Sequence, residues 1–339
     1  MENDYTLITQ IQIYNSDPIS AINLNEEMLL FGTMLGYCGY YLIKEKNLKI
    51  ISEIQDEHII GIQFFKNKFI YGVGDQKIII LEKLKNDKDY TIKTINNHSS
   101  DAEHYKKCED TFCLLKDNIL FSIELHIPSE DEKSASLLVN HWEIKNILKN
   151  ASFRGDITIS TFWVPFDFDG ILLIYIDFLD GGKRNLIIYD CKAKKQKLCI
   201  KLWDMEKNET LGHISHIKKL KDDKIFLVHS YKSCQIRDLN FKLIKKFEHN
   251  GKEIIACDIY YNNKNELKIF LLDLNCSVWV YSYNYEYKDY LFNMHKLNSI
   301  NQDIKDQKFF SLGYPYYIKV SEKYIAITTD QGCFLFKKT

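Results

Sequence analysis

Short apolar runs separated by polar turns recur along the whole chain. Each repeat contains an alternating apolar run, a polar turn, a stronger apolar run, a turn with Gly, Asp or Asn, a third apolar run and a weaker fourth. Runs of about five to seven residues with a period of two are typical of β-strands. Apolar residues never persist at i, i+3, i+4 and i+7 over a long stretch, so we expect helices to be few and short. The pattern predicts repeated four-stranded antiparallel sheets.

The spacing of the strongest runs indicates seven repeats. We take these runs as the second strands, and they are 40 to 55 residues apart. They centre on Leu30, Ile70, Leu120, Leu173, Phe226, Phe270 and Ile325. The clearest repeat follows His58 and reads IIGIQFF, NKFIYGVGD, KIIILEK and YTIKTIN, with Gly74-Asp75 as a turn signal.

The two ends of the chain complement each other. The last repeat has only three runs, YYIKV, KYIAITTD and GCFLFKKT, while an extra run at residues 5–14 precedes the first full repeat. Pairing this N-terminal run with residues 333–336 completes the seventh sheet, closes the ring and protects its edges. We therefore expect one all-β domain, residues 1–339, in which the seventh sheet is completed by residues 5–14.

Several dipeptides resemble the signatures of the WD40 repeat family. Gly212-His213 resembles the Gly-His pair before a first strand, and Trp142-Glu143, Tyr189-Asp190 and Arg237-Asp238 approximate the Trp-Asp pair that ends a third strand. In well-formed repeats of this family, a His, a Ser or Thr, an Asp and a Trp link the strands through hydrogen bonds, and in the second repeat His58 and Asp75 take two of these positions. The resemblance covers essentially the whole chain and implies a divergent seven-bladed β-propeller.

One literal match admits two registers. Trp203-Asp204 looks like the end of a third strand, but only seven residues separate it from Gly212-His213. We place it in the outer fourth strand of its blade, with Tyr189-Asp190 ending the third. The alternative register, with Trp203-Asp204 ending the third strand, stays open at this point.

Composition narrows the classes of partner. Lys plus Arg number 45 against 46 Asp plus Glu, a formal charge of -1, which disfavours an extended basic surface for nucleic acid. The longest apolar run, residues 171–176, is too short to span a membrane, and the polar N-terminus lacks a signal-peptide pattern, so we expect an intracellular protein. The nine cysteines are an odd number within mostly apolar runs, as expected of buried free thiols.

Candidate chemistry is sparse. His104, Cys108 and Cys113 have a spacing that could suit zinc but lack a clear fourth ligand. Gly32, Gly36 and Gly39 lie in a predicted strand, turn and strand, so we expect close backbone packing there and not a phosphate loop. Asp167 and Asp169 precede the predicted second strand, whereas Asp177 and Asp180 follow it, so the pairs lie at opposite ends. We predict no catalytic residues, metal or cofactor.

The long loops favour a scaffold that binds other proteins, as a subunit of a larger assembly. If all first strands start from one face, which we call the top face, the connections at 99–110, 126–136, 177–184, 204–213 and 298–314 emerge there. They lean acidic, so a basic partner segment is favoured. The candidate contact residues are His104, Tyr105, Glu130, Asp131, Glu132, Asp180, Arg184, Phe309, Phe310, Tyr314 and Tyr316.

The alternative function is a propeller recruited to anionic membranes. Phe153-Arg154-Gly155 resembles part of the Phe-Arg-Arg-Gly motif of phosphoinositide-binding propellers, but the second arginine is missing. A lysine-rich rim on the opposite face could attract anionic lipid, RNA or an acidic protein. This rim comprises Lys192, Lys194, Lys195, Lys197, Lys218, Lys219 and Lys221. We favour neither nucleic acid nor lipid over protein partners.

Overall fold

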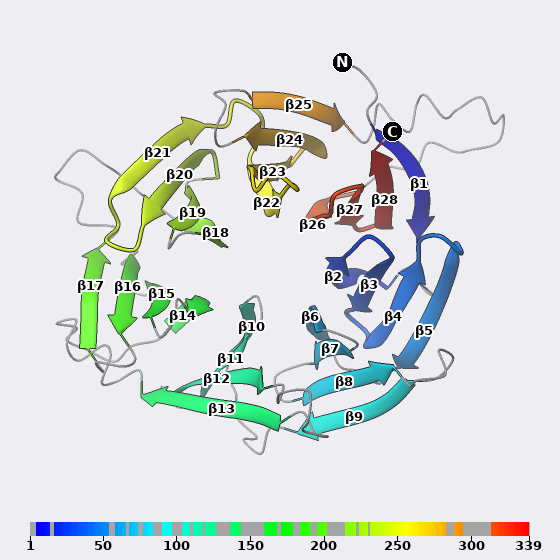
Figure 1. The fold of residues 1–339 in the computed structure, drawn as a ribbon, viewed down its shortest axis with the longest axis horizontal. Coiled ribbons are helices and arrows are strands. Elements are labelled where there is room, and N and C mark those ends of the chain that lie inside the picture. The colour runs from blue at the N-terminus through cyan, green and yellow to red at the C-terminus, as the bar shows by residue number, and fades with distance from the viewer. Residues whose placement is uncertain are drawn as a thin grey trace. The chain divides into compact units, whose positions relative to one another are not determined.

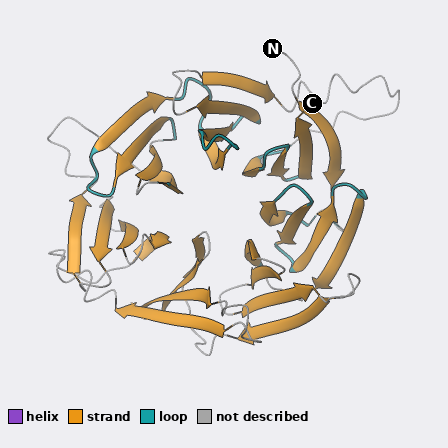
Figure 2. Cartoon of the chain, in the orientation of Figure 1, coloured by secondary structure: helices purple, strands orange, loops and turns teal. Residues whose placement is uncertain are grey.

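The computed structural model describes most of the repeated apolar runs, all of them as strands. The described residues are 5–13, 17–53, 58–65, 68–73, 77–83, 90–96, 104–108, 111–116, 119–126, 136–143, 159–167, 171–178, 184–190, 195–201, 214–221, 224–229, 231–282, 288–293 and 313–338. Within these ranges every regular element is a strand and none is a helix (Figure 2). Consequently, none of these residues belongs to a helix that is long and apolar enough to cross a membrane.

The chain forms two compact units, and the first contains residues 1–73 and 248–339. Its sheets are antiparallel and have the orders β2-β3-β4-β5, β22-β23-β24-β25 and β1-β28-β27-β26, and β6 pairs with β7 (Figure 1). The strands are β1 (Tyr5–Ile11), β2 (Ile19–Leu24), β3 (Met28–Thr33), β4 (Tyr37–Leu42), β5 (Asn47–Glu53), β6 (Ile59–Phe65), β7 (Lys68–Val73), β22 (Ile254–Tyr261), β23 (Leu267–Asp273), β24 (Ser277–Ser282), β25 (Lys288–Asn293), β26 (Pro315–Val320), β27 (Tyr324–Thr329) and β28 (Gly332–Lys338). Contacts of β22 with β26, of β26 with β2 and of β2 with β6 place these sheets side by side.

The second unit, residues 74–247, repeats the same architecture. Its sheets have the orders β10-β11-β12-β13, β14-β15-β16-β17 and β18-β19-β20-β21, and β8 pairs with β9. The strands are β8 (Lys77–Lys83), β9 (Tyr90–Asn96), β10 (His104–Cys108), β11 (Thr111–Lys116), β12 (Ile119–His126), β13 (Ser136–Glu143), β14 (Ile159–Asp167), β15 (Ile171–Phe178), β16 (Arg184–Asp190), β17 (Lys195–Lys201), β18 (Ile214–Leu220), β19 (Lys224–His229), β20 (Ser233–Asp238) and β21 (Leu243–Glu248). The first strands β10, β14 and β18 contact one another in succession.

The N-terminal strand joins the last sheet, as its sequence predicts. β1 pairs antiparallel with β28, with Leu7 opposite Phe336 and Ile11 opposite Cys333. The register shifts between Leu7 and Thr9, so a bulge moves the following residues to the other face of the sheet. As a result Tyr5 packs in the core on one side of the sheet, whereas Ile11 packs in the core on the other side.

Both faces of the last sheet are buried, which explains its nearly continuous apolar strands. In β28, Phe334 and Phe336 pack against the β22–β25 sheet, while Cys333 and Leu335 pack against the β2–β5 sheet. All four side chains are at most 2% exposed. At about 25 cal/mol per Å² of apolar area, burial between neighbouring sheets is the main stabilising contribution to this unit.

Gly32 and Gly39 allow close packing, as expected from the sequence. A Cβ at Gly32 would collide with the side chain of Ile59 on β6 of the neighbouring sheet. A Cβ at Gly39 would lie 2.7 Å from the ring of Phe31. These glycines therefore set the distance between backbone and neighbouring side chains, and they lie in strands without a helix that could bind phosphate.

The predicted strand numbering is wrong in the third repeat. Leu120 lies in β12, which is the third strand of its sheet, because β10 and β11 precede it. Trp142-Glu143 consequently ends the fourth strand, β13, and not the third. The run that forms β11, TFCLLK, is shorter than the following run, so choosing the strongest run selected the wrong strand. In the other six repeats, the residue predicted at the centre of the second strand lies in that strand.

Candidate functional site

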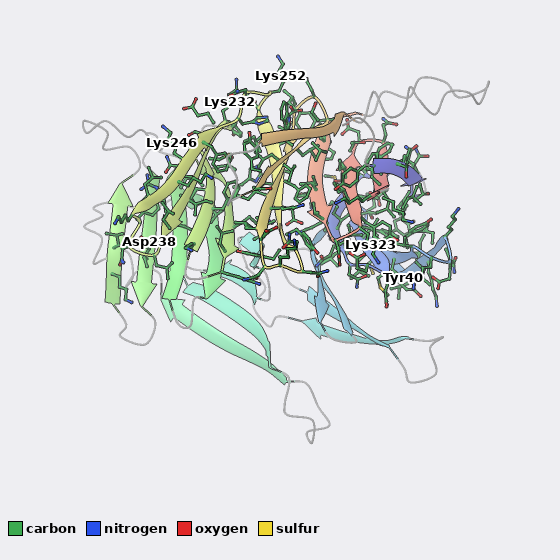
Figure 3. All side chains as sticks on the ribbon, turned by 45° about the horizontal axis from the view of Figure 1, so that its top comes forward. Tyr40, Lys232, Asp238, Lys246, Lys252 and Lys323 are labelled. Carbon is green, nitrogen blue, oxygen red and sulfur yellow. The ribbon has the colours of Figure 1, made fainter. Side chains whose placement is uncertain are left out.

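The first unit has two distinct ends, defined by the direction of its first strands. The top face is the end where β2, β22 and β26 begin, and the bottom face is where they end. Figure 3 shows Lys252, just before β22, and Lys323, in the β26–β27 turn, at opposite ends of these sheets. The β3–β4, β23–β24 and β27–β28 turns therefore lie at the top face, where the sequence predicts partner binding.

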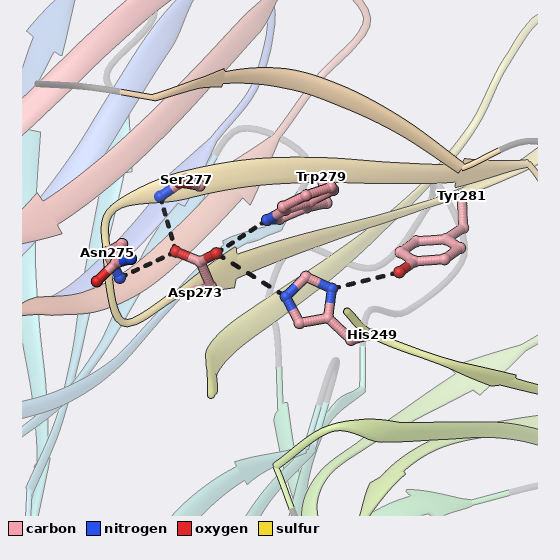
Figure 4. A network of polar contacts seen from close by, with 6 residues as sticks. All are labelled: His249, Asp273, Asn275, Ser277, Trp279 and Tyr281. Carbon is pink, nitrogen blue, oxygen red and sulfur yellow. Dashed lines mark hydrogen bonds and ion pairs between the residues drawn. The ribbon is translucent and has the colours of Figure 1, made fainter. Parts of the chain in front are cut away.

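A buried carboxylate organises the β23–β24 turn at the top face. Asp273 Oδ1 accepts hydrogen bonds from the backbone N–H groups of Asn275, at 2.9 Å, and Ser277, at 3.0 Å. Asp273 Oδ2 accepts a hydrogen bond of 2.9 Å from Trp279 Nε1 (Figure 4). One side chain thus connects both ends of the turn to the third strand.

His249 links this turn to the segment that leads into β22. Its Nε2 atom lies 3.9 Å from Asp273 Oδ2, its Nδ1 atom lies 3.3 Å from the Tyr281 hydroxyl, and its ring meets Trp279 edge-on. A Cβ at Gly251 would lie 2.7 Å from His249 Cε1 and 2.9 Å from Asp273 Oδ2, so only glycine fits there without displacing the pair. The network therefore connects the backbone segment before β22 to the turn that follows β23.

The surroundings of Asp273 favour its charged form. Burial alone raises the pKa of this carboxyl, but the interactions with His249, Trp279, Ser277 and Asn275 outweigh burial and lower the pKa below its usual value. The neighbouring thiol of Cys276 responds in the opposite direction. Burial, followed by the negative charges of Asp273 and Asp330, raises the pKa of Cys276 to about 11. Cys276 is therefore an unreactive thiol at neutral pH.

The next top-face turn, between β27 and β28, is tied to its neighbours. Asp330 accepts a hydrogen bond of 2.8 Å from the N–H of Tyr314 and another from the Tyr316 hydroxyl. Donation to this carboxylate, followed by burial, raises the pKa of Tyr316 to about 12. The side-chain amide of Gln10, on the N-terminal strand, donates a bond of 2.9 Å to the Gln331 carbonyl. Tyr314 and Tyr316 are thus brought together, with ring centroids 5.6 Å apart.

Large apolar side chains are exposed at this end of the unit. Met34 is 45% exposed and Leu35 50% in the β3–β4 turn, Leu274 is 37% exposed in the β23–β24 turn, and Tyr314 is 47% exposed before β26. These four are half of the eight exposed large hydrophobic side chains found among the described residues. Tyr317, near the start of β26, is a fifth. Exposed Met, Leu and Tyr side chains gathered on one face are typical of a protein-binding surface.

One of two predicted contact regions lies elsewhere than expected. His104 and Tyr105 lie in strand β10 and not in a loop. Glu130, Asp131 and Glu132 lie outside the described residues, in the connection between β12 and β13. The error for His104 and Tyr105 follows from the strand count in the third repeat, because the prediction treats β10 as part of a loop.

The structure describes some of the remaining predicted residues. Arg184 begins β16, Tyr189-Asp190 ends this third strand as predicted, and Asp238 ends β20. Lys195 and Lys197 lie in β17, Lys218 and Lys219 in β18, and Lys221 directly after it. His58 precedes β6 and is exposed. The other predicted residues lie outside the described residues. They are Asp75, Asp180, Lys192, Lys194, Trp203-Asp204, Gly212, His213, Phe309 and Phe310.

The sequence contains a signal for the Asp273 network, but not in the dipeptides that resemble the family signatures. Asp273 comes six residues before Trp279 and 24 residues after His249. The family signatures have Gly before His and Asp after Trp, whereas here His249 precedes Asn250-Gly251 and Trp279 precedes Val280. In this repeat the network is therefore identified by the spacing between His249, Asp273 and Trp279, and not by adjacent pairs of residues.

Solved structures with the same arrangement of sheets are WD40 proteins. The WD40 domain of Pan2 from Neurospora crassa is 11% identical over 100% of this chain and 97% of that chain, with a TM-score of 0.62. Sqt1 from Saccharomyces cerevisiae is 11% identical over 100% of both chains, with a TM-score of 0.61. A chain of the mitotic checkpoint complex is 7% identical over 100% of this chain and 93% of its own length, with a TM-score of 0.61.

The fold is that of the WD40 β-propellers. Neither a family model nor a curated protein matches the sequence. The arrangement of Asp273, Trp279 and His249 corresponds to the network that the sequence resemblance implied for well-formed repeats. In this WD40 fold the hydroxyl that bonds to His249 belongs to Tyr281, on the third strand β24. In the β18–β21 sheet, buried Arg237 occupies the tryptophan position expected from the sequence and bonds to Gln235 and the Phe241 carbonyl.

Proposed function

We propose that this chain is a seven-bladed WD40 propeller, closed by its N-terminal strand, that binds other proteins through its top face without catalysing a reaction. The β1–β28 pairing supports closure, because it gives the last sheet strands from both ends of the chain. In this proposal the chain is a single domain and a subunit of a larger assembly. The similarity to a chain of the mitotic checkpoint complex accords with an assembly role.

The observation that carries the proposal is the exposure of Met34, Leu35, Leu274 and Tyr314 at one end of the first unit. Burying these side chains against a bound partner would contribute a favourable free energy of about 25 cal/mol per Å² of apolar area. The turns that present them are held by hydrogen bonds to Asp17, Asp273 and Asp330. A surface held in place before binding loses little conformational entropy on docking.

Affinity purification from native cells tests this proposal with a matched pair of variants. Leu35→Ser combined with Tyr314→Ala removes apolar area from the top face, and Leu48→Ser removes it from the exposed side of β5. We expect wild type and Leu48→Ser to retain the same stoichiometric partner chains and the top-face variant to lose them. Equal retention by all three proteins would refute top-face binding. Recovery on anionic liposomes without protein partners would instead favour the membrane-recruited alternative.

A further inference from the structure

A small cavity opens at the top face, between residues that precede β2 and the β27–β28 turn of the first unit. Its volume is about 50 Å³, several times the roughly 10–15 Å³ that one water needs. It is lined by Gln12, Ile13, Asp17, Asp330, Gln331 and Gly332. The cavity therefore offers room for the end of a polar side chain.

Two carboxylates give this cavity a negative charge. Asp17 is 4% exposed, and from the described residues its oxygens accept the N–H of Leu35, at 3.1 and 3.3 Å. Asp330 accepts from the Tyr314 N–H and the Tyr316 hydroxyl. Among the described residues, neither carboxylate forms an ion pair with a lysine or arginine. Because an ionised carboxylate offers about four acceptor positions, both retain capacity for a charged donor.

The surroundings of the cavity are also negatively charged. The top-face segments 10–13, 17–18, 33–37, 273–277, 313–317 and 329–332 contain three aspartates and neither lysine nor arginine. Lys252, which is exposed before β22, is followed directly by Glu253. Leu35 and Tyr314 connect the cavity to the exposed apolar surface, because each donates its backbone N–H to one of the two carboxylates. A ligand that fills the cavity is therefore flanked by apolar contacts.

We propose that this cavity binds an arginine side chain of a partner protein whose neighbouring residues are apolar and pack on Leu35 and Tyr314. A guanidinium has five N–H donors in a rigid plane, which suits the two carboxylates. Lysine offers the same charge with three donors and fits fewer of these acceptors. The inference rests on the proposed function and adds the chemistry of the segment that the top face recognises.

The test titrates the full chain with Nα-acetyl-arginine amide and follows backbone amides by NMR. Nα-acetyl-citrulline amide has the same shape without the charge, and Nα-acetyl-lysine amide has the charge without the planar group. We expect saturable shifts of the Leu35, Tyr314 and Gln331 amides with the arginine probe, weaker shifts with lysine and none with citrulline. Equal responses to arginine and citrulline, or no response at these amides, would overturn the proposal.

Two variants separate binding from folding. Asp17→Asn with Asp330→Asn keeps an acceptor oxygen at each site, and we expect it to weaken arginine binding by about tenfold for each charge-assisted bond lost. Glu27→Gln removes an exposed carboxylate at the bottom face and should leave binding unchanged. Unweakened binding by the double variant would contradict the site. If the double variant still captures the partners that Leu35→Ser with Tyr314→Ala loses, the arginine site is wrong and the proposed function stands.

Discussion

The two ends of the first unit use the same turn chemistry for different surfaces. At the bottom face, Asn25 Oδ1 accepts bonds of 2.8 Å from the N–H groups of Glu27 and Met28. At the top face, Asp273 orders its turn in the same way through the N–H groups of Asn275 and Ser277. Asn and Asp are suited to both positions because their short side chains bond to backbone two to four residues ahead.

The ends differ in what they expose. Bottom-face turns bond to each other through polar groups: Asn263 donates to Glu322 at 3.0 Å, and the Lys323 N–H donates to Glu26 at 3.2 Å. Lys, Glu and Asn dominate there, as is usual on a solvated surface. The top face instead exposes Met34, Leu35, Leu274 and Tyr314. Stable turns are therefore common to both faces, and exposed apolar area distinguishes the one that we expect to bind.

The largest expected effect comes from removing the N-terminal strand from its sheet. Ile11 is 3% exposed, and Ile11→Asp places an unpaired charge in the core between the last sheet and the β2–β5 sheet. We expect a loss of several kcal/mol, a large share of the stability of a typical domain, and a lower unfolding temperature. Thr6→Asp, at an exposed position of the same strand, is the control and should change the unfolding temperature little.

A smaller effect is expected from removing the side chains that hold two turns, Asp273 at the top face and Asn25 at the bottom face. Asp273→Ala leaves Trp279 Nε1 and two backbone N–H groups without their acceptor in a buried turn, and we expect the free energy of unfolding to fall by about 3 kcal/mol. Asn25→Ala removes two bonds from a more exposed turn and should cost about 1 kcal/mol. Guanidinium denaturation measures both. Equal losses would mean that the top-face turn is not specially anchored.

Acid should reduce the difference in the free energy of unfolding between the wild type and Asp273→Asn. Since the folded-state pKa of Asp273 is lowered, its ionised form adds stability that is complete above the unfolded pKa of about 3.9. This contribution is lost as pH falls through the folded-state pKa. We therefore expect wild type to be the more stable protein at pH 7 and the two stabilities to converge below about pH 4. A constant difference across pH would exclude this role of the charge.

The smallest effect is expected for the exposed apolar residues themselves. Leu35→Ser and Leu48→Ser remove side chains that are 50% and 38% exposed, so each should change the free energy of unfolding by less than about 0.5 kcal/mol. Denaturant midpoints would reveal any larger change. A marked loss for Leu35→Ser alone would indicate that Leu35 supports the fold, which would remove the main reason for treating the top face as a binding surface.

The sequence predicted the repeated four-stranded sheets and the β1–β28 pairing because both depend on apolar periodicity, which burial dictates locally. It failed where the order of strands depended on relative strength, as in the short β11. That single shift put Trp142-Glu143 at the end of a third strand instead of a fourth, and put His104 and Tyr105 in a loop instead of a strand. The exposed surface was harder still to predict. Tyr314 was among the candidate contact residues, but Leu35 looks like a core residue in the sequence, and only its position in a turn reveals its exposure.

Oxidative footprinting of the chain, alone and within its native assembly, tests the central claim most directly. Met34, Leu35 and Tyr314 report on the top face, and Lys264 and Lys323, labelled in parallel by amine acetylation, report on the bottom face. The account predicts strong protection of the three top-face residues in the assembly and unchanged labelling of the two lysines. Protection confined to the bottom face, with Met34, Leu35 and Tyr314 as reactive as in the isolated chain, would contradict it.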